Sequence, residues 1–539
     1  MVADADMPAQ NEVRATEATP LIAGSFQDRQ SNILPRNRLL VVFPALALVH
    51  FTSFIDQTSI STALPSIASA LNAGSSISWA GTSFLTTSTS IQLMNGRLSD
   101  IFGRKTCLIT ALSLMGLGNF LSGCSQTTGQ LYATRAFSGL GAGALNALVQ
   151  ITISDITRLD QRGYYFGILG VAVALGNGLG PVVGGVLTEN ASWRWAFWFI
   201  CPLAVIAAGL LALVLPGSSA ADEIGTKVRM LDWGGIVISM TAVVLILIPI
   251  SQGGSAIEWM SPMIIGMLIS GVILLAAFLF IEWRLVKLPI LPMRLFQYNR
   301  STNILLAVNI PIGWVYWGNL FYLPLYFQMV RRLNPSTAGS FILPMVIAHG
   351  ATSGLSGVVT SLAGCYKPVI SSGAGLWAIG AILKTTYGQT TSFNLFFVAG
   401  IFEGIGVGCA LQPVMVGLLA GSDNVDRAVI TGLRNFVRDM GGAIGITVSG
   451  AILNNYLHAG LKGHFAPELI SHIASSAFNL SELNLSAEEK GMILDVYVRG
   501  IHAVFVSYAV LTVVLFLATL CLRDYGLGRK AEQQESDVE

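Results

Sequence analysis

The decapeptide GRLSDIFGRK, residues 96–105, carries one acid, three bases and two glycines between long apolar runs. Charged residues make up only 11% of the 539-residue chain, so four of them within ten positions need an explanation. Glycines permit a tight turn and a close approach of two helices. We interpret this stretch, called here the charged segment, as a short connection between two buried helices. Its candidate functional residues are Gly96, Arg97, Asp100, Gly103, Arg104 and Lys105.

The composition predicts a membrane protein. Hydrophobic residues account for 53% of the chain, and the mean hydropathy is +0.66. Soluble domains carry about a quarter charged residues. Apolar runs of about 18 or more residues recur, and they lack the alternating pattern of barrel strands. We therefore predict an all-α polytopic membrane protein with about 14 membrane-spanning helices. A net charge of +1 does not indicate a nucleic-acid partner.

Several other function classes find no support. The six cysteines include no CxxC pair, so we predict neither a zinc site nor a disulfide framework, and we expect no metal or cofactor. The phosphate-binding pattern GxxxxGK[ST] is absent, which argues against a nucleotide-driven pump. No cluster of acids or histidines indicates an enzyme. A channel or receptor remains a remote alternative.

Polar segments divide the chain. A disordered N-terminal tail (1–38) and a polar C-terminal tail (523–539) flank the apolar region. Between them we predict an N-terminal six-helix half (39–215), a linker with two extra helices (216–300) and a C-terminal six-helix half (301–522). The last contains one long loop (454–500).

Basic residues predict the orientation. Lysine and arginine are concentrated in alternate connections, so those connections and both tails are expected to be cytosolic. Three glycosylation sequons, at Asn190, Asn479 and Asn484, then fall on the non-cytosolic side together with loop 454–500. A fourth sequon, at Asn299, falls on the cytosolic side and should stay unmodified.

An internal repeat relates the two halves. RAFSGLGAGAL (135–145) and GIFEGIGVGCA (400–410) share a phenylalanine and three glycines at the same spacing. Gly139 and Gly180 are 41 positions apart, and so are Gly404 and Gly445. The match therefore extends over two consecutive helices. Paired repeats around a central site are a recurrent plan of secondary transporters.

Five motifs, in order, resemble those of the major facilitator superfamily. GRLSDIFGRK resembles its loop 2–3 signature, LYATRAFSGLGAGA (131–144) its helix 4 arginine motif, and GNGLGPVVGG (176–185) its helix 5 antiporter motif. FIDQTSISTALPSIA (54–68) and SWRWAFWFICP (192–202) resemble the helix 1 and helix 6 motifs of its fourteen-helix drug:proton antiporter branch, fungal type. The resemblance covers residues 39 to about 522. It implies the major facilitator fold, with two pseudo-symmetric six-helix halves plus two inserted helices.

The resemblance implies a gating role for the charged segment. In the family, the acid equivalent to Asp100 lies near the start of the penultimate helix, where the helix dipole favours a carboxylate. Arg104 is expected to pair with Asp155 at the end of helix 4, so that the segment holds the halves together in one state only. A plain positive-inside signal would explain Arg104 and Lys105, but not Asp100.

The helix 5 motif is expected to bend against a neighbouring helix during alternating access. A proline removes a backbone donor, and glycines provide a flat contact face. Generic packing of small residues is the alternative interpretation. The motif residues are Gly176, Gly180, Pro181, Gly184 and Gly185.

The resemblance also implies a central cavity lined by helices 1, 4, 9 and 12. Charged side chains inside a membrane are costly and usually functional. Asp56 and Arg135 are placed to pair, whereas Glu403 has no basic residue nearby in sequence. A lone buried carboxylate prefers its neutral form, so Glu403 is the first candidate proton carrier and Asp56 the second. The candidate cavity residues are Asp56, Arg135, Asn309, Trp314, Trp317, Asn319, Glu403 and Gln412.

Four further residues have plainer interpretations. For the two tryptophans in the cavity set, anchoring at the membrane interface is the alternative interpretation. His50 and His349 are interpreted as satisfied core histidines. Arg434 and Arg438, near the start of helix 13, are interpreted as side chains that reach back to the aqueous interface.

These observations predict a proton-coupled antiporter, active as a monomer in the lipid bilayer, that exports drugs, toxins or secondary metabolites by alternating access. The alternative is a vacuolar transporter of basic amino acids. EATPLI (17–22) matches an acidic dileucine sorting pattern, which would favour the vacuole over the plasma membrane.

Overall fold

The computed structural model describes residues 33–73, 76–77, 79–216, 232–253, 259–286, 289–297, 299–333, 335–423, 426–466, 469–470 and 486–527. The sorting pattern 17–22 and the sequons at Asn479 and Asn484 lie outside the described residues.

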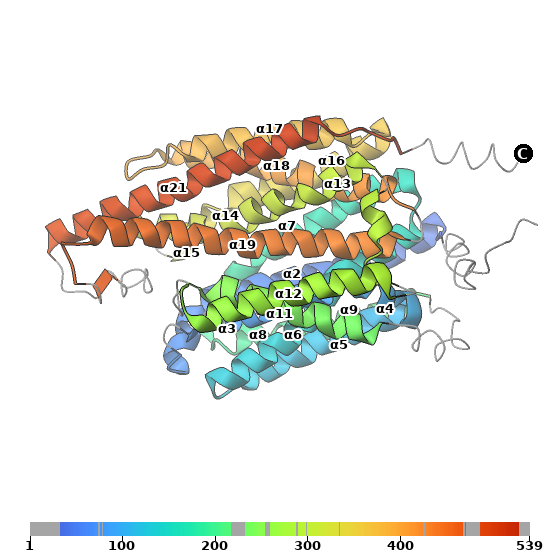
Figure 1. Ribbon diagram of the computed structural model, residues 1–539, viewed down its shortest axis with the longest axis horizontal. Helices are drawn as coiled ribbons and strands as arrows, with labels where there is room; N and C mark the ends of the chain where they lie inside the picture. The colour runs from blue at the N-terminus through green and yellow to red at the C-terminus, as the bar shows by residue number, and fades with distance from the viewer. Residues whose placement is uncertain are drawn as a thin grey trace, which may run out of the picture.

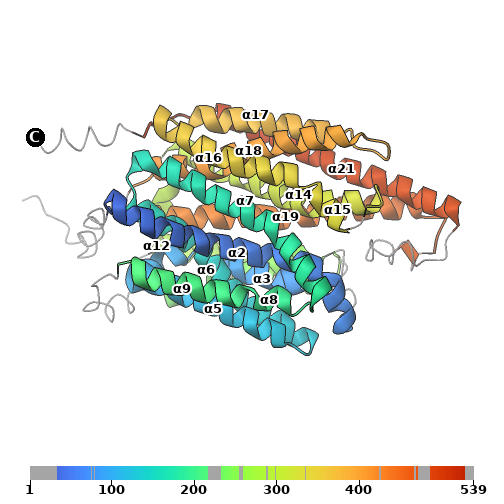
Figure 2. The same ribbon diagram turned by 180° about the vertical axis from the view of Figure 1, so that it is seen from behind.

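Long helices lie side by side in two groups (Figures 1 and 2). Apolar residues of both groups form one extended buried cluster, which includes Leu145 of the first and Leu418 of the second. The first group comprises α2 (Arg36–Ala70), α3 (Trp79–Ile91), α4 (Asn95–Phe102), α5 (Arg104–Cys124), α6 (Thr128–Ile156), α7 (Leu159–Asn190), α8 (Trp195–Trp198) and α9 (Ile200–Val214).

The second group follows the two inserted helices. α11 (Trp233–Gln252) and α12 (Pro262–Arg284) pack against each other, and α11 also contacts one helix of each group. The 3-10 helix η4 (Met293–Gln297) then leads to α13 (Arg300–Ala307), α14 (Asn309–Met329), α15 (Pro335–Ser340), α16 (Leu343–Ala363), α17 (Lys367–Lys384), α18 (Phe393–Ala420), α19 (Arg427–Leu461) and α21 (Ala487–Leu520).

Twelve helices of the described part are long and apolar enough to cross a membrane. Two others, α3 and α17, occupy the positions of the remaining predicted spans. α3 has only 13 residues, and α17 begins and ends with a lysine. The all-α membrane fold is thus confirmed.

The predicted bounds of the loop 454–500 are wrong. α19 continues to Leu461, and α21 begins at Ala487, where Ser486 and Glu489 form a reciprocal N-terminal cap. The two helices stay in contact beyond the predicted ends, because Gly460 leaves room for Val496. Apolar packing between them, with Leu457 and Ile493 in the buried cluster, therefore prolongs both helices.

The repeat is visible in the packing. α5 packs on α6 as α17 packs on α18, and α2 packs on α7 as α14 packs on α19. The two groups meet along two seams, α7 against α16 and α19 against α3, α4 and α6. These seams bring the candidate residues of both halves together.

Candidate gate and transport site

The charged segment comprises α4 from its second residue, Gly96, and the first two residues of α5. It lies at an end of the bundle called here the charged end. Gly103 joins the two helices with a φ of +85°, a conformation that favours glycine. Arg104 lies 2.7 Å from Asp100 and 2.8 Å from Asp155 at the end of α6, which confirms the expected pairing. Lys105 donates to the carbonyl of Ala212, within the same half.

The charged segment also contacts the second half. A Cβ added to Gly96 would lie 2.9 Å from the carbonyl carbon of Ala428, in the first turn of α19. The next residue, Arg97, donates from its side chain to the carbonyl of Pro289, in the connecting segment between α12 and α13. The acid-bearing α4 therefore lies against the N-terminus of α19, as the gating prediction requires.

Two further hydrogen bonds cross between the halves near this end. Gln92 donates to Asp439 over 2.7 Å, and Asn435 donates to Gln150 over 3.3 Å. In this conformation the halves are joined at the charged end.

The helix 5 motif (176–185) lies on α7 and packs against α2. Cβ atoms added to Gly180 and Gly184 would lie 2.0 Å and 2.1 Å from atoms of Thr58 and Ser59. Gly176 and Gly185 face the same helix. The Thr62 hydroxyl donates to the carbonyl of Pro181 over 3.0 Å. The motif is therefore a tight glycine face against the first helix, and its bending stays a prediction.

Asp56 and Arg135 form the predicted ion pair. They lie 3.1 Å apart and each is 1% exposed. Ser138 donates to the second carboxylate oxygen of Asp56 over 3.4 Å. Arg135 also donates to Asn119 of α5 over 3.3 Å, and its guanidinium lies 4.2 Å from the ring centroid of Phe84.

The expectation that Glu403 lacks a basic partner is wrong. Lys384, the last residue of α17, lies 2.7 Å from Glu403, and each is 1% exposed. Asn319 of α14 accepts a hydrogen bond from Lys384 and donates to Glu403. The antiparallel packing of α17 on α18 brings together residues 19 positions apart, which a search of near sequence neighbours misses.

The other predicted cavity residues divide between packing and polar positions. The indoles of Trp314 and Trp317 lie against Gly445 and Gly442 of α19, so both pack within the second half. Asn309 donates to the carbonyl of Leu305 in its own chain segment. Gln412 is buried, and its side-chain oxygen has no partner in the described part of the chain.

Arg434 and Arg438 do not reach back to the interface, and this prediction is wrong. Arg434 is fully buried; it donates to the carbonyl of Leu411 and to Asn435. Arg438 is 6% exposed and pairs with Asp439 over 3.0 Å. Both lie on the buried face of α19, one turn apart.

Arg434, like Arg162 of α7, is a buried arginine without an ion pair in the described part of the chain. Within the described residues no carboxylate lies at ion-pair distance from it, and its Nε atom has no partner. His50 and His349 are buried, but His50 and Nε2 of His349 have no hydrogen-bond partner in the described part, so they are not the satisfied histidines expected.

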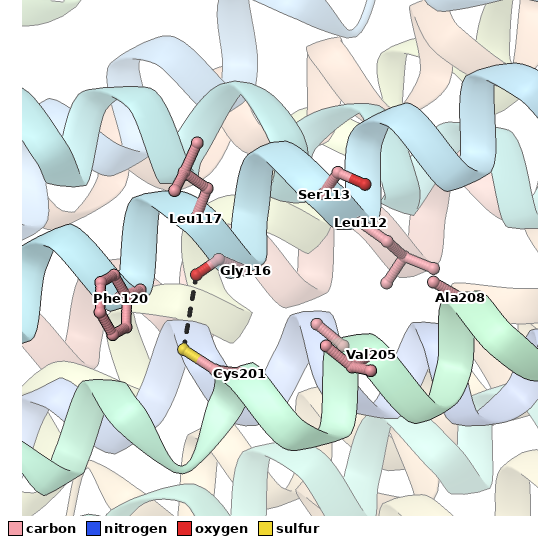
Figure 3. Close-up of a pocket in the computed structure, with 9 residues that line it drawn as sticks. Leu112, Ser113, Gly116, Leu117, Phe120, Cys201, Val205 and Ala208 are labelled. Carbon is pink, nitrogen blue, oxygen red and sulfur yellow. Dashed lines mark hydrogen bonds between the residues drawn. The ribbon is translucent and has the colours of Figure 1, made fainter.

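A shallow apolar groove lies elsewhere, between α5 and α9 (Figure 3). Leu117, Phe120 and Val205 in its lining are more than half exposed, so it opens on the outer surface of the bundle. Cys201 donates to the carbonyl of Gly116 inside it. It contains none of the candidate transport residues.

The two described sequons lie at opposite ends. α7 starts beside the charged end and ends at Asn190, which is exposed. Asn299 caps α13 by accepting from the backbone of Thr302 over 2.7 Å. Its side chain also contacts Gly421, which follows the last residue of α18.

The paired six-helix halves, the charged segment and the buried polar clusters define a polytopic membrane transporter. The chain belongs to the Major Facilitator Superfamily, whose profile matches residues 46–445.

Among its relatives, Citrate exporter 1 of Yarrowia lipolytica is 40% identical over 92% of this chain and 74% of its own length. Efflux pump dotC of Dothistroma septosporum is 31% identical over 78% of this chain and 73% of its own length. The human organic anion transporter MFSD10 (TETRAN) shares the fold, with a TM-score of 0.59 and 14% identity over 90% of this chain and all of that one.

Proposed function

We propose that this transporter exports small organic acids with two or more carboxylates, driven by proton exchange. The observation that carries the proposal is Arg434, a buried guanidinium between the halves without a carboxylate partner among the described residues. A buried charge needs a counter-charge, and a substrate carboxylate supplies one in bidentate geometry. The name of the Yarrowia relative, a citrate exporter, supports the same class of substrate.

The charge balance weighs against a basic amino acid. Arg434 and Arg438 face one acid, Asp439, so this cluster carries one net positive charge. A cationic substrate would be repelled there. Efflux of an uncharged metabolite remains a second candidate, favoured by relatives named efflux pumps.

We propose further that the charged end faces the cytosol, in the plasma or the vacuolar membrane. The basic connections support this orientation. The halves are joined at that end in the conformation described, so the substrate would leave on the opposite side.

The test is citrate transport by purified protein in liposomes, with Arg434→Gln. A charge-assisted hydrogen bond contributes about 1.5–3 kcal/mol, so citrate affinity should fall about 10- to 150-fold. Arg300→Gln, which removes an exposed arginine at the start of α13, is the matched control. Unchanged half-saturation by citrate in Arg434→Gln refutes the substrate class, and transport of an uncharged metabolite instead would establish the second candidate.

A further inference from the structure

We propose that Lys384, Glu403 and Asn319 form the proton-exchange site, whereas the Asp56–Arg135 pair is its static counterpart in the other half. The inference rests on the proposed proton-driven export.

The internal repeat places Lys384 and Glu403 at the positions of Asn119 and Ser138, the two residues that hydrogen-bond to the Asp56–Arg135 pair. Gly139 and Gly404 are 265 positions apart in the sequence, and so are Asn119 and Lys384, as well as Ser138 and Glu403. Each half therefore holds a buried ion pair with an asparagine among the same three helices. The roles are exchanged, however, because the acid comes from the first helix of one half and from the fourth helix of the other.

The chemistry of the two bases differs. An arginine side chain does not lose its proton in proteins, whereas a buried lysine does so readily. Arg135 is also fixed by Asn119 and by the ring of Phe84. Lys384 lies 2.7 Å from Glu403 and does not carry the permanent charge of a guanidinium. In the proposed cycle Lys384 stays protonated, and Glu403 binds the proton that is exchanged.

The two acids also differ in their hydrogen bonds. Both oxygens of Asp56 accept one, from Arg135 and from Ser138. The hydrogen bonds to Glu403 in the described part of the chain both end on Oε1. Oε2 of Glu403 is therefore the atom available to bind a proton.

The charge change at this site is well defined. With Glu403 ionised and Lys384 protonated, the pair is neutral overall. Binding one proton at Oε2 converts the carboxylate into a carboxylic acid and leaves the pair with one positive charge. Release of that proton on the other side of the membrane restores the neutral pair.

Aromatic side chains surround the site. The Lys384 ammonium lies 5.1 Å and 5.5 Å from the ring centroids of Phe505 and Tyr508 on α21. The titratable groups that interact electrostatically with Glu403 are Lys384, Tyr508 and Tyr387, the last of which follows α17. α14 contributes the neutral Asn319, and His349 of α16 contacts the ring of Tyr316 instead.

Asn319 connects the site to the seam between the halves. Tyr316, one turn earlier on α14, accepts a hydrogen bond from Asn177 of α7. Protonation of Glu403 weakens the bonds at Asn319 and so acts on the helix that contacts the other half. We therefore expect the empty transporter to return only when Glu403 is protonated.

The experiment compares two modes of transport in liposomes with citrate as the probe. Citrate–citrate exchange at equal pH does not require the empty transporter to return, whereas net efflux does. Glu403→Gln mimics the protonated acid, so exchange should persist while net efflux loses its dependence on pH. Lys384→Arg keeps the positive charge and holds Glu403 ionised, so the pH profile should shift to lower pH.

Controls separate coupling from folding. Lys367→Gln removes the lysine at the other end of α17 and should keep the wild-type profile. The double variant Lys384→Gln, Glu403→Gln leaves no unpaired buried charge and should behave as Glu403→Gln does. If Glu403→Gln and the double variant keep the wild-type pH profile, the assignment of the proton-exchange site to Lys384, Glu403 and Asn319 is refuted, but proton coupling itself is not. If the wild type itself ignores pH, the proposed coupling fails with it.

Discussion

Replacing Gly96 with alanine tests whether the charged segment holds the halves together. A Cβ at this position would lie 2.9 Å from the carbonyl carbon and 3.0 Å from the oxygen of Ala428. Overpacking of this kind costs about 1–3 kcal/mol. Because the colliding atoms belong to different halves, the cost falls only on the state in which α4 touches α19.

The local effect on α4 has the opposite sign. Alanine is preferred over glycine inside a helix by up to about 1 kcal/mol, so α4 itself is not weakened. This preference acts equally in the joined and the separated states, so it cancels from their ratio. The contact with Ala428 alone should therefore shift that ratio about 5- to 160-fold toward separation at the charged end.

The assay is a distance distribution between two fluorescent labels placed across the charged end, measured in detergent or nanodiscs. Gly81→Ala is the matched control, because no atom lies within 4 Å of a Cβ added there. An unchanged distribution in Gly96→Ala, or an equal change in Gly81→Ala, would refute the reasoning.

Two further predictions concern the gate and the orientation. Asp100→Asn should leave the protein inserted but strongly reduce transport, because Arg104 loses a carboxylate 2.7 Å away; wild-type flux at normal expression would contradict the gating role. Asn190, at the end opposite the charged segment, should accept a glycan in a eukaryotic host while Asn299 stays unmodified, and a mass shift that depends on Asn299 would reverse the orientation.

The helices and the first-half ion pairs were predictable because local signals define them. Apolar runs of sufficient length mark membrane helices wherever they pack. Asp56 and Arg135 were predicted as a pair because a charge inside a membrane is costly and the helix topology placed the two at the same depth. Arg104 and Asp155 were predicted as a pair because the resemblance places both at the same end of the bundle.

The second-half site was not predictable in the same way. The partner of Glu403 is the last residue of the preceding helix, so its identity depends on how α17 packs on α18. The inward position of Arg434 depends likewise on the rotation of α19, whose bases near one end match an interfacial pattern equally well. One usable signal was present, because the repeat aligns Lys384 with Asn119 and Glu403 with Ser138.

The two halves therefore share the glycines that determine their packing, and they differ in the buried polar residues that determine their response to pH. Shared glycines, such as Gly139 and Gly404, contact backbone atoms of neighbouring helices and preserve the packing of both halves. The buried ion pairs differ: in the first half both oxygens of Asp56 accept hydrogen bonds beside the fixed charge of Arg135, whereas in the second half the hydrogen bonds to Glu403 in the described part of the chain leave Oε2 open. An ion pair that costs desolvation energy in both halves, but can change its charge in only one, gives the two halves different responses to pH. The proposed proton-driven cycle uses this asymmetry, since only the Glu403 site would bind and release a proton.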